Sequence, residues 1–175
     1  AKGSFYFNPV EDTFPDAQEA IKEKYPTFYG NNVFPTEELP QFESSVKACS
    51  KLMVAVGQLV ARQCDRLVQR KLKGSIHPKL NENIVRLSDH HAARLLHYFA
   101  MDEATLKSLD SDDGWCGWHN DHCTLTSLVP AVFHNDATGE VVPNPDPSAG
   151  LYIRARDGRL VKPSAPKGAL FFQIG

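Results

Sequence analysis

The sequence predicts an α+β domain in which helices come first and the strands that follow pack as a sandwich or barrel. Three observations carry this prediction: helical periodicity over residues 43–72, short Thr- and aliphatic-rich segments after residue 115, and turn residues between those segments. The chain has 175 residues, of which 42% are hydrophobic and 23% are charged. This length and composition are typical of one soluble globular domain with a core of its own.

The helical part of the prediction comes from the first half of the chain. Residues 1–42 are rich in Pro, Phe, Tyr and Asn and are expected to form turns and short extended pieces. Gly74 is the expected stop of a long supporting helix over residues 43–72, and a shorter helix is expected over residues 78–87. Apolar residues recur at steps of three and four along the long helix and form one apolar stripe, which contains Cys49, Met53, Val56, Val60, Cys64 and Leu67.

The second half of the chain is predicted to form strands. Residues 100–114 are acidic and are expected to be a solvated surface loop that contains Asp110, Asp112 and Asp113. Asp157–Gly158 predicts a tight hairpin turn. No segment follows the last, very apolar strand to pair with it, so we expect a core that is incomplete at its C-terminus. A helix is the alternative to a strand over residues 92–99. The predicted strands cover residues 92–99, 122–133, 150–156, 159–162 and 168–174.

Charge and hydropathy exclude several classes of function. The formal net charge of -2 gives no indication of a nucleic-acid partner. No apolar run approaches the roughly 20 residues that cross a bilayer, and the first residues do not resemble a secretory signal. Cys49 and Cys64 are too far apart on a straight helix to form a disulfide. We therefore expect all four cysteines to be reduced, in an intracellular and most simply cytoplasmic protein.

The densest collection of ligand-type side chains lies in residues 115–123, Trp-Cys-Gly-Trp-His-Asn-Asp-His-Cys. In an extended segment, His119 and Asp121 point to the same face. An imidazole and a carboxylate are two of the three ligands in the facial triad of a non-haem iron(II) site. A His-x-Asp pair is also typical of a surface turn in which the two side chains only hydrogen-bond. Asp65 and Glu82 are expected on helix surfaces, with no special role.

Zinc is a weaker alternative for the same segment. Soft and imidazole ligands occur there within eight residues, at Cys116, His119, His122 and Cys123. Structural zinc sites usually combine two separate pairs of ligands, and a second pair is not present in the sequence.

The His-x-Asp motif and the strand after it resemble the metal-binding strand of the isopenicillin N synthase-like 2-oxoglutarate dioxygenases, in which a Leu-Thr-rich strand follows the motif. The later hairpin and final strand are similar to those of the same family, as are the strand that ends at Tyr98 and the N-terminal region. The resemblance thus covers nearly the whole chain. Its segments are residues 3–6, 25–30, 94–98, 119–128, 150–161 and 166–175.

The resemblance implies a fold and an activity. The fold would be a double-stranded β-helix (jelly-roll) core over residues 91–175, preceded by a leader and helical region over residues 1–90. His119 and Asp121 would be the first two iron ligands, and Tyr98 would hydrogen-bond the cosubstrate. The implied activity is oxidation, by hydroxylation or a related reaction, of a small organic substrate with Fe(II), 2-oxoglutarate and O2. The loops at 100–118 and 134–149 would then select the substrate.

The departures from the family pattern concern the rest of its site. The distal His and the Arg-x-Ser pair of the family would fall after Gly175, so we expect a domain that is truncated at its C-terminus. His97, His122 and His134 are candidates for the third ligand, although His122 points to the opposite face of the strand from Asp121. The alternative function is that of a degenerate, non-catalytic relative that acts as a binding or structural subunit of a protein complex.

Overall fold

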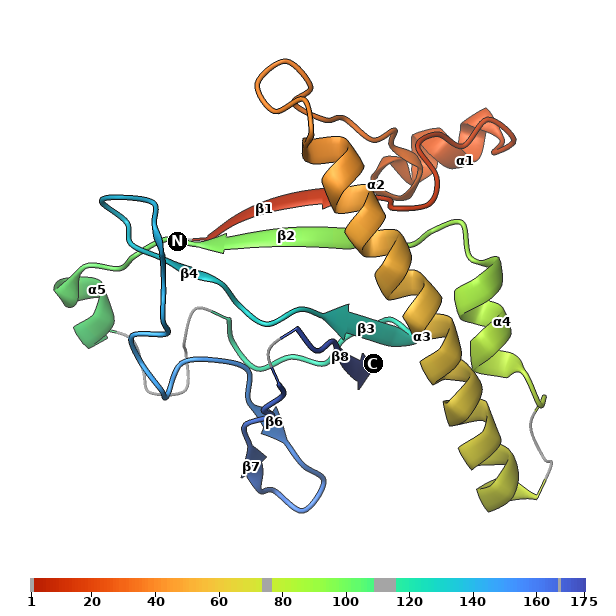
Figure 1. Cartoon of the computed structure of the whole chain (residues 1–175). Helices are drawn as coiled ribbons and strands as arrows, with labels where there is room; N and C mark the ends of the chain where they lie inside the picture. The colour runs from red at the N-terminus through yellow and green to blue at the C-terminus, as the bar shows by residue number, and fades with distance from the viewer. Residues whose placement is uncertain (1, 74–76, 109–115, 167) are drawn as a thin grey trace. The chain divides into compact units, whose positions relative to one another are not determined.

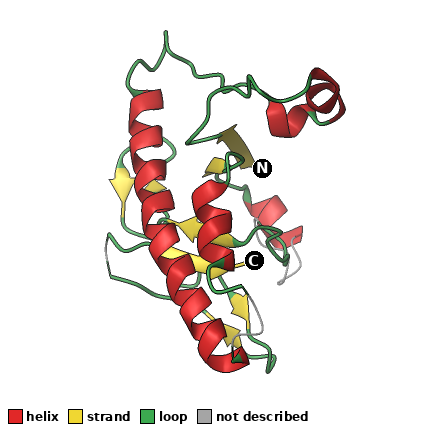
Figure 2. Cartoon of the chain, turned by 90° about the vertical axis from the view of Figure 1, so that its right-hand side faces the viewer, coloured by secondary structure: helices red, strands yellow, loops and turns green. Residues whose placement is uncertain are grey.

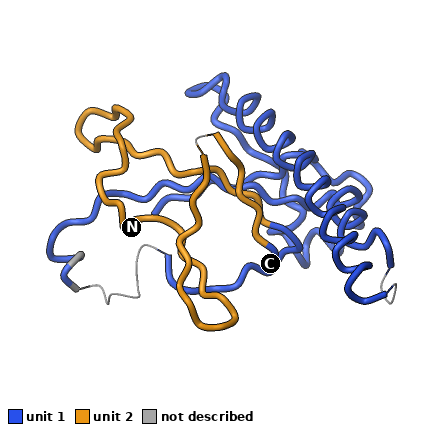
Figure 3. Tube along the Cα trace, turned by 60° about the horizontal axis from the view of Figure 1, so that its bottom comes forward, with its two compact units in different colours: residues 1–125, 174–175 blue, residues 126–173 orange. Residues whose placement is uncertain are grey.

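The computed structural model describes residues 2–73, 77–108, 116–166 and 168–175 (Figure 1). The chain divides into two compact units, residues 1–125 with 174–175 and residues 126–173 (Figure 3). The first unit contains the helices and the longest strand pair. Its elements are β1 (Lys2–Phe7), α1 (Glu19–Lys24), α2 (Pro26–Tyr29), α3 (Phe42–Leu72), α4 (Leu80–Leu87), β2 (Ala93–Tyr98) and α5 (Glu103–Ser108).

Strands β1 and β2 form an antiparallel pair in which Lys2 lies opposite Tyr98 and Phe7 lies opposite Ala93. Alternate side chains leave the pair on opposite faces. On one face the ring of Phe5 packs edge-on against Phe42 at the start of α3, with 5.1 Å between the ring centroids. This aromatic contact places the apolar face of the strand pair against the first turn of the long helix.

The expectation of an irregular segment over residues 1–42 is wrong for β1, α1 and α2. The partner of β1 lies more than 80 residues along the chain, so no local pattern reveals the pairing. Gly3 and Ser4 also lower the strand propensity of the segment. Helices α1 and α2 span only six and four residues, which is too short for a periodicity to emerge.

The long helix is confirmed as α3, and the shorter one as α4. Helix α3 ends at Leu72 and is followed by the C-cap residue Lys73, whose φ of 49° is left-handed; the predicted stop at Gly74 lies outside the described residues. Helix α4 runs beside α3 in two views at right angles (Figures 1 and 2). Gly57 and Ala61 are among the buried residues of α3, and small side chains at such positions let two helices approach closely.

Asp65 links α3 to α4, and the expectation that it lies on the surface without a role is wrong. It is only 4% exposed. Its carboxylate accepts hydrogen bonds from the backbone N–H and the side-chain amide of Asn81, at 3.0 and 2.8 Å, and from the backbone N–H of Glu82 at 2.8 Å. These backbone N–H groups belong to the first turn of α4, whose own N-cap residue, Lys79, makes no side-chain cap. Asp65 therefore caps α4 from the neighbouring helix.

Glu82 has a role as well. Its carboxylate accepts hydrogen bonds from Nε and Nη2 of Arg62, at 3.0 and 2.8 Å. This ion pair is a second connection between α3 and α4, next to the Asp65 cap. Neither connection is visible in the sequence, because the residues are 16 to 20 positions apart.

The leader is fixed by a reciprocal pair of asparagines. The N–H of Asn8 donates to Oδ1 of Asn32 at 2.8 Å, and Nδ2 of Asn32 donates to the carbonyl of Asn8 at 2.7 Å. Nδ2 of Asn32 also donates to Asp12 at 2.8 Å, and Asp12 pairs with Lys47 of α3 at 2.6 Å. The side chain of Asn32 thus hydrogen-bonds both backbone groups of Asn8, directly after the end of β1.

We expect Asn32→Ala to lower the free energy of unfolding by about 1–3 kcal/mol, because two backbone groups and the Asp12 carboxylate lose a partner. Chemical denaturation of the variant and of the wild type measures this loss. The matched control is Asn31→Ala, since Asn31 is the exposed neighbour. Equal losses in the two variants would contradict the role of the Asn8–Asn32 pair.

The second unit contains short antiparallel strand pairs: β4 (Phe133–His134) with β5 (Val141–Val142), and β6 (Ile153–Arg154) with β7 (Leu160–Val161). The hairpin turn at Asp157–Gly158 is confirmed between β6 and β7, and Gly158 has the φ of +82° that such a turn requires. The predicted strands exist, although each is shorter than expected.

The last strand has a partner that lies earlier in the chain. Strand β8 (Phe171–Ile174) pairs with β3 (Leu125–Leu128), which precedes it in the chain. Within the described part of the chain each sheet has two strands, and no closed barrel is formed. The jelly-roll core therefore stays a prediction.

Two further expectations concern the segment before the β region. Residues 100–114 were expected to be a loop, but α5 begins there, with Asp102 accepting a hydrogen bond from the N–H of Thr105 at 2.7 Å. Asp110, Asp112 and Asp113 lie outside the described residues.

The four cysteines carry free thiols. Among the described helices, none combines the length and apolar character needed to cross a membrane.

Candidate metal centre

The His-x-Asp motif lies in an irregular segment just before β3, within the first unit. Gly175 packs closely against the backbone of this segment. A Cβ added to Gly175 would lie 1.8 Å from the carbonyl oxygen of Cys123 and 3.0 Å from that of Asp121. Only a residue without a side chain permits this approach. The backbone after Asp121 is therefore closely packed, although it is not part of a strand.

The structure brings His119 and Asp121 together. Nε2 of His119 lies 3.4 Å from Oδ1 of Asp121. Two ligand atoms that each lie about 2.1 Å from one metal ion are roughly 3.0–3.4 Å apart. The spacing of the two atoms thus suits two neighbouring positions on one ion, and a neutral imidazole with a carboxylate suits iron(II) chemically.

The other ring nitrogen of His119 fixes the orientation of the imidazole. Nδ1 lies 2.9 Å from the carbonyl oxygen of Gly117. A carbonyl only accepts hydrogen bonds, so Nδ1 is the donor in this contact, and Nε2 is the ring atom that faces the Asp121 carboxylate. Metal-binding histidines are commonly oriented in this way by a backbone carbonyl. The side chain of His119 is 61% exposed and that of Asp121 is 23% exposed, so the pair is accessible from solvent.

Tyr98, at the end of β2, is connected to this pair through Cys116. Burial raises the pKa of Tyr98, the neighbouring Cys116 side chain raises it further, and the positive charge of Arg94 lowers it. Sγ of Cys116 in turn lies 3.9 Å from Nδ1 of His119. Cys116 thus lies next to both Tyr98 and His119, on the Nδ1 side of the imidazole.

The candidates for a third ligand differ in their positions. His97 packs edge-on against Phe99, with 4.5 Å between ring centroids, and it leaves β2 on the face opposite to Tyr98. His134 belongs to the second unit, where its Nδ1 lies 3.0 Å from the carbonyl of Gly139. His122 is exposed. Among the described residues, neither His97 nor His122 completes a group of three metal ligands with His119 and Asp121.

A complete metal site is not formed by the part of the chain that the structure describes. There, no group of three or more His, Cys, Asp or Glu side chains is arranged to hold a metal ion. This applies to the zinc set of Cys116, His119, His122 and Cys123 as well as to the iron set. The described residues supply two neighbouring ligands and the groups that orient them.

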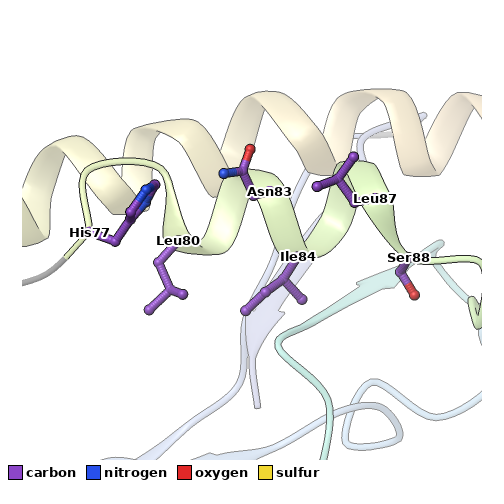
Figure 4. Close-up of a pocket in the computed structure, with 6 residues that line it drawn as sticks. All are labelled: His77, Leu80, Asn83, Ile84, Leu87 and Ser88. Carbon is purple, nitrogen blue, oxygen red and sulfur yellow. The ribbon is translucent and has the colours of Figure 1, made fainter.

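Sequence reasoning missed the contributions of Gly117 and Cys116. A backbone carbonyl gives no sequence signal, and Cys116 was considered only as a zinc ligand. It also missed a shallow groove on α4 (Figure 4), in which Leu80 and Ile84 point away from α3. The groove holds none of the site residues. Its lining is His77, Leu80, Asn83, Ile84, Leu87 and Ser88.

Comparisons with known proteins leave the chain without an assigned family: no family model, no curated protein and no solved structure matches it.

Proposed function

We propose that the protein takes part in Fe(II)- and 2-oxoglutarate-dependent oxidation of a small organic substrate, with His119 and Asp121 as two of the iron ligands. The observation that carries the proposal is the 3.4 Å approach of Nε2 of His119 to Oδ1 of Asp121. The carbonyl of Gly117 supports it, because its contact with Nδ1 leaves Nε2 on the side of the ring that faces Asp121.

Each residue has a defined task in this proposal. His119 and Asp121 hold the ion, and Gly117 keeps the imidazole in the productive orientation. Tyr98 keeps its proton, and its hydroxyl group would hydrogen-bond the cosubstrate. Iron with 2-oxoglutarate supplies the oxidising chemistry: one oxygen atom of O2 enters succinate, with release of CO2, and the other enters a C–H bond of the substrate.

The test is an anaerobic titration of the protein with Fe(II) and 2-oxoglutarate, monitored for the visible charge-transfer band of the chelate. It should be performed on this chain and on the natural full-length protein. We expect the band in whichever form supplies a third ligand. Absence of the band from both forms would sink the catalytic proposal and favour the role of a binding or structural subunit.

We expect Tyr98→Phe to weaken 2-oxoglutarate binding to the Fe(II) protein by roughly tenfold, which corresponds to the loss of one hydrogen bond. The amplitude of the charge-transfer band against cosubstrate concentration measures this change. Tyr25→Phe is the control, because Tyr25 is an exposed residue between α1 and α2. Unchanged affinity in Tyr98→Phe would remove Tyr98 from the cosubstrate site.

A further inference from the structure

The face of the β1–β2 pair opposite to α3 carries a row of polar and aromatic side chains. Register places Lys2 opposite Tyr98, Ser4 opposite Leu96 and Tyr6 opposite Arg94. Because side chains alternate along a strand, these six leave the sheet on the face that does not carry Phe5. Tyr6 is 61% exposed and Leu96 is 43% exposed. This polar face is accessible within the first unit.

Ser4 and Tyr6 hold Arg94 in place on the polar face, and within the described ranges Arg94 has no acidic partner. Its Nε and Nη2 donate to Oγ of Ser4, at 3.2 and 2.7 Å, and its guanidinium carbon lies 4.9 Å from the centre of the Tyr6 ring. The ion pairs among the described residues do not include Arg94. The Ser4 hydroxyl accepts from the guanidinium, so its own proton is free to donate. A guanidinium with a neighbouring hydroxyl is suited to a carboxylate.

The same face leads to the candidate metal centre. Arg94 acts electrostatically on the phenol of Tyr98, and Tyr98 contacts Cys116, which lies beside His119. At about 3.3 Å per residue, the backbones of Arg94 and Tyr98 are about 13 Å apart along β2. A small molecule lying along the strand can therefore reach from the guanidinium to the neighbourhood of the His119–Asp121 pair.

We propose that Arg94 and Ser4 bind a carboxylate of a small organic acid whose other end extends along β2 toward His119 and Asp121. The acid is the substrate or the cosubstrate of the proposed oxidation. Only the destination of its far end rests on the proposed function; carboxylate binding at Arg94 does not depend on a metal.

The first experiment titrates the metal-free protein with hexanoate, with 2-oxoglutarate and with the neutral analogue hexanamide. The NMR signals of the Arg94 Nε–H and of the Ser4 amide report binding. We expect both signals to shift with a carboxylate and not with hexanamide. A response to hexanoate assigns the site to a substrate acid, and a response to 2-oxoglutarate alone assigns it to the cosubstrate. Shifts of equal size with hexanamide, or no shift with either acid, would overturn the proposal.

Variants separate recognition from folding. We expect Arg94→Gln to weaken carboxylate binding by about tenfold or more, and Arg94→Lys by several-fold, since an ammonium group lacks the planar pair of donors. Arg86→Gln, on the exposed side of α4, is the matched control and should bind as the wild type does. Ser4→Ala keeps the Arg94–Tyr6 contact, so it tests the site even if Arg94→Gln fails to fold. Wild-type affinity in both Arg94→Lys and Ser4→Ala would overturn the proposal.

The outcome is distinguishable from that of the proposed function. Carboxylate binding that depends on Arg94, without a charge-transfer band in any form, would leave an acid-binding protein without iron chemistry. A charge-transfer band together with unchanged binding in the Arg94 variants would reject this inference alone.

Discussion

Asp65→Ala is expected to lower the free energy of unfolding by about 2–4 kcal/mol, because a buried charged acceptor of three hydrogen bonds is lost and the first turn of α4 keeps unpaired N–H groups. The residue is 4% exposed, so water replaces the carboxylate poorly. Chemical denaturation measures the loss. Amide hydrogen exchange shows where the stability is lost. Exchange should be faster at Asn81 and Glu82, whose N–H groups donate hydrogen bonds to the Asp65 carboxylate.

Two comparisons make this expectation specific. Asp65→Asn keeps the size of the side chain and one acceptor oxygen, and it should lose about half as much stability as the alanine variant. Asp16→Ala removes an exposed carboxylate and should change stability by less than about 0.5 kcal/mol. Similar losses for Asp65→Ala and Asp16→Ala would contradict the capping role.

The same interaction predicts a dependence on pH. Burial raises the pKa of Asp65, but the hydrogen bonds from Glu82 and Asn81 lower it more, so the pKa in the folded protein is below 3.8. A group whose pKa is lowered by folding binds its proton more readily in the unfolded chain. Its contribution is therefore complete above the unfolded value and is lost as the pH falls through the folded value. Wild-type stability should decline more steeply below pH 3.8 than that of Asp65→Asn.

His119→Ala and Asp121→Ala are each expected to weaken Fe(II) binding by about 100-fold or more, since loss of a direct ligand should exceed the 10–100-fold effect of removing a residue that only orients one. Anaerobic titration, or Co(II) with its visible spectrum in place of iron, measures the affinity. The effect should be seen in whichever form of the protein binds the metal. Cosubstrate chelation should disappear in both variants.

Neighbouring residues of the same chemical type provide the controls. His122→Ala removes an exposed imidazole three positions from His119, and Asp136→Ala removes an exposed carboxylate in the second unit. Both should bind Fe(II) as the wild type does. If His119→Ala retained wild-type affinity while His122→Ala lost it, the ligand set would have to be built around His122 and Cys123 instead.

The sequence predicted those parts of the fold that depend on local periodicity and turn chemistry. Helix α3 spans 31 residues, and its apolar stripe repeats often enough to be recognised. Gly158 was recognised because its turn requires a positive φ. Strand β1 and the buried state of Asp65 were missed, because both depend on partners that are distant in the chain.

The candidate site likewise has some features that the sequence predicted and others that depend on contacts it does not reveal. His119 and Asp121 are two residues apart, so their convergence follows from spacing, and Tyr98 was selected by resemblance. The orientation of His119 depends on the Gly117 carbonyl, and the side-chain environment of Tyr98 depends on Cys116 and Arg94. The contact of Arg94 with Ser4 joins residues 90 positions apart. Only the register of a sheet produces such a pair.

That register also sets the order in which the protein can assemble during synthesis. Strand β1 is the first described element to leave the ribosome, yet its partner β2 ends at Tyr98. The loop between them, which contains α1 to α4, must be closed before the pair forms, and closing it carries an entropic cost. Helices α3 and α4 have local contacts and need not wait. The nascent chain is therefore expected to hold a preformed helical hairpin while Phe5 and Phe7 remain uncovered, which makes this interval the one in which a chaperone would bind.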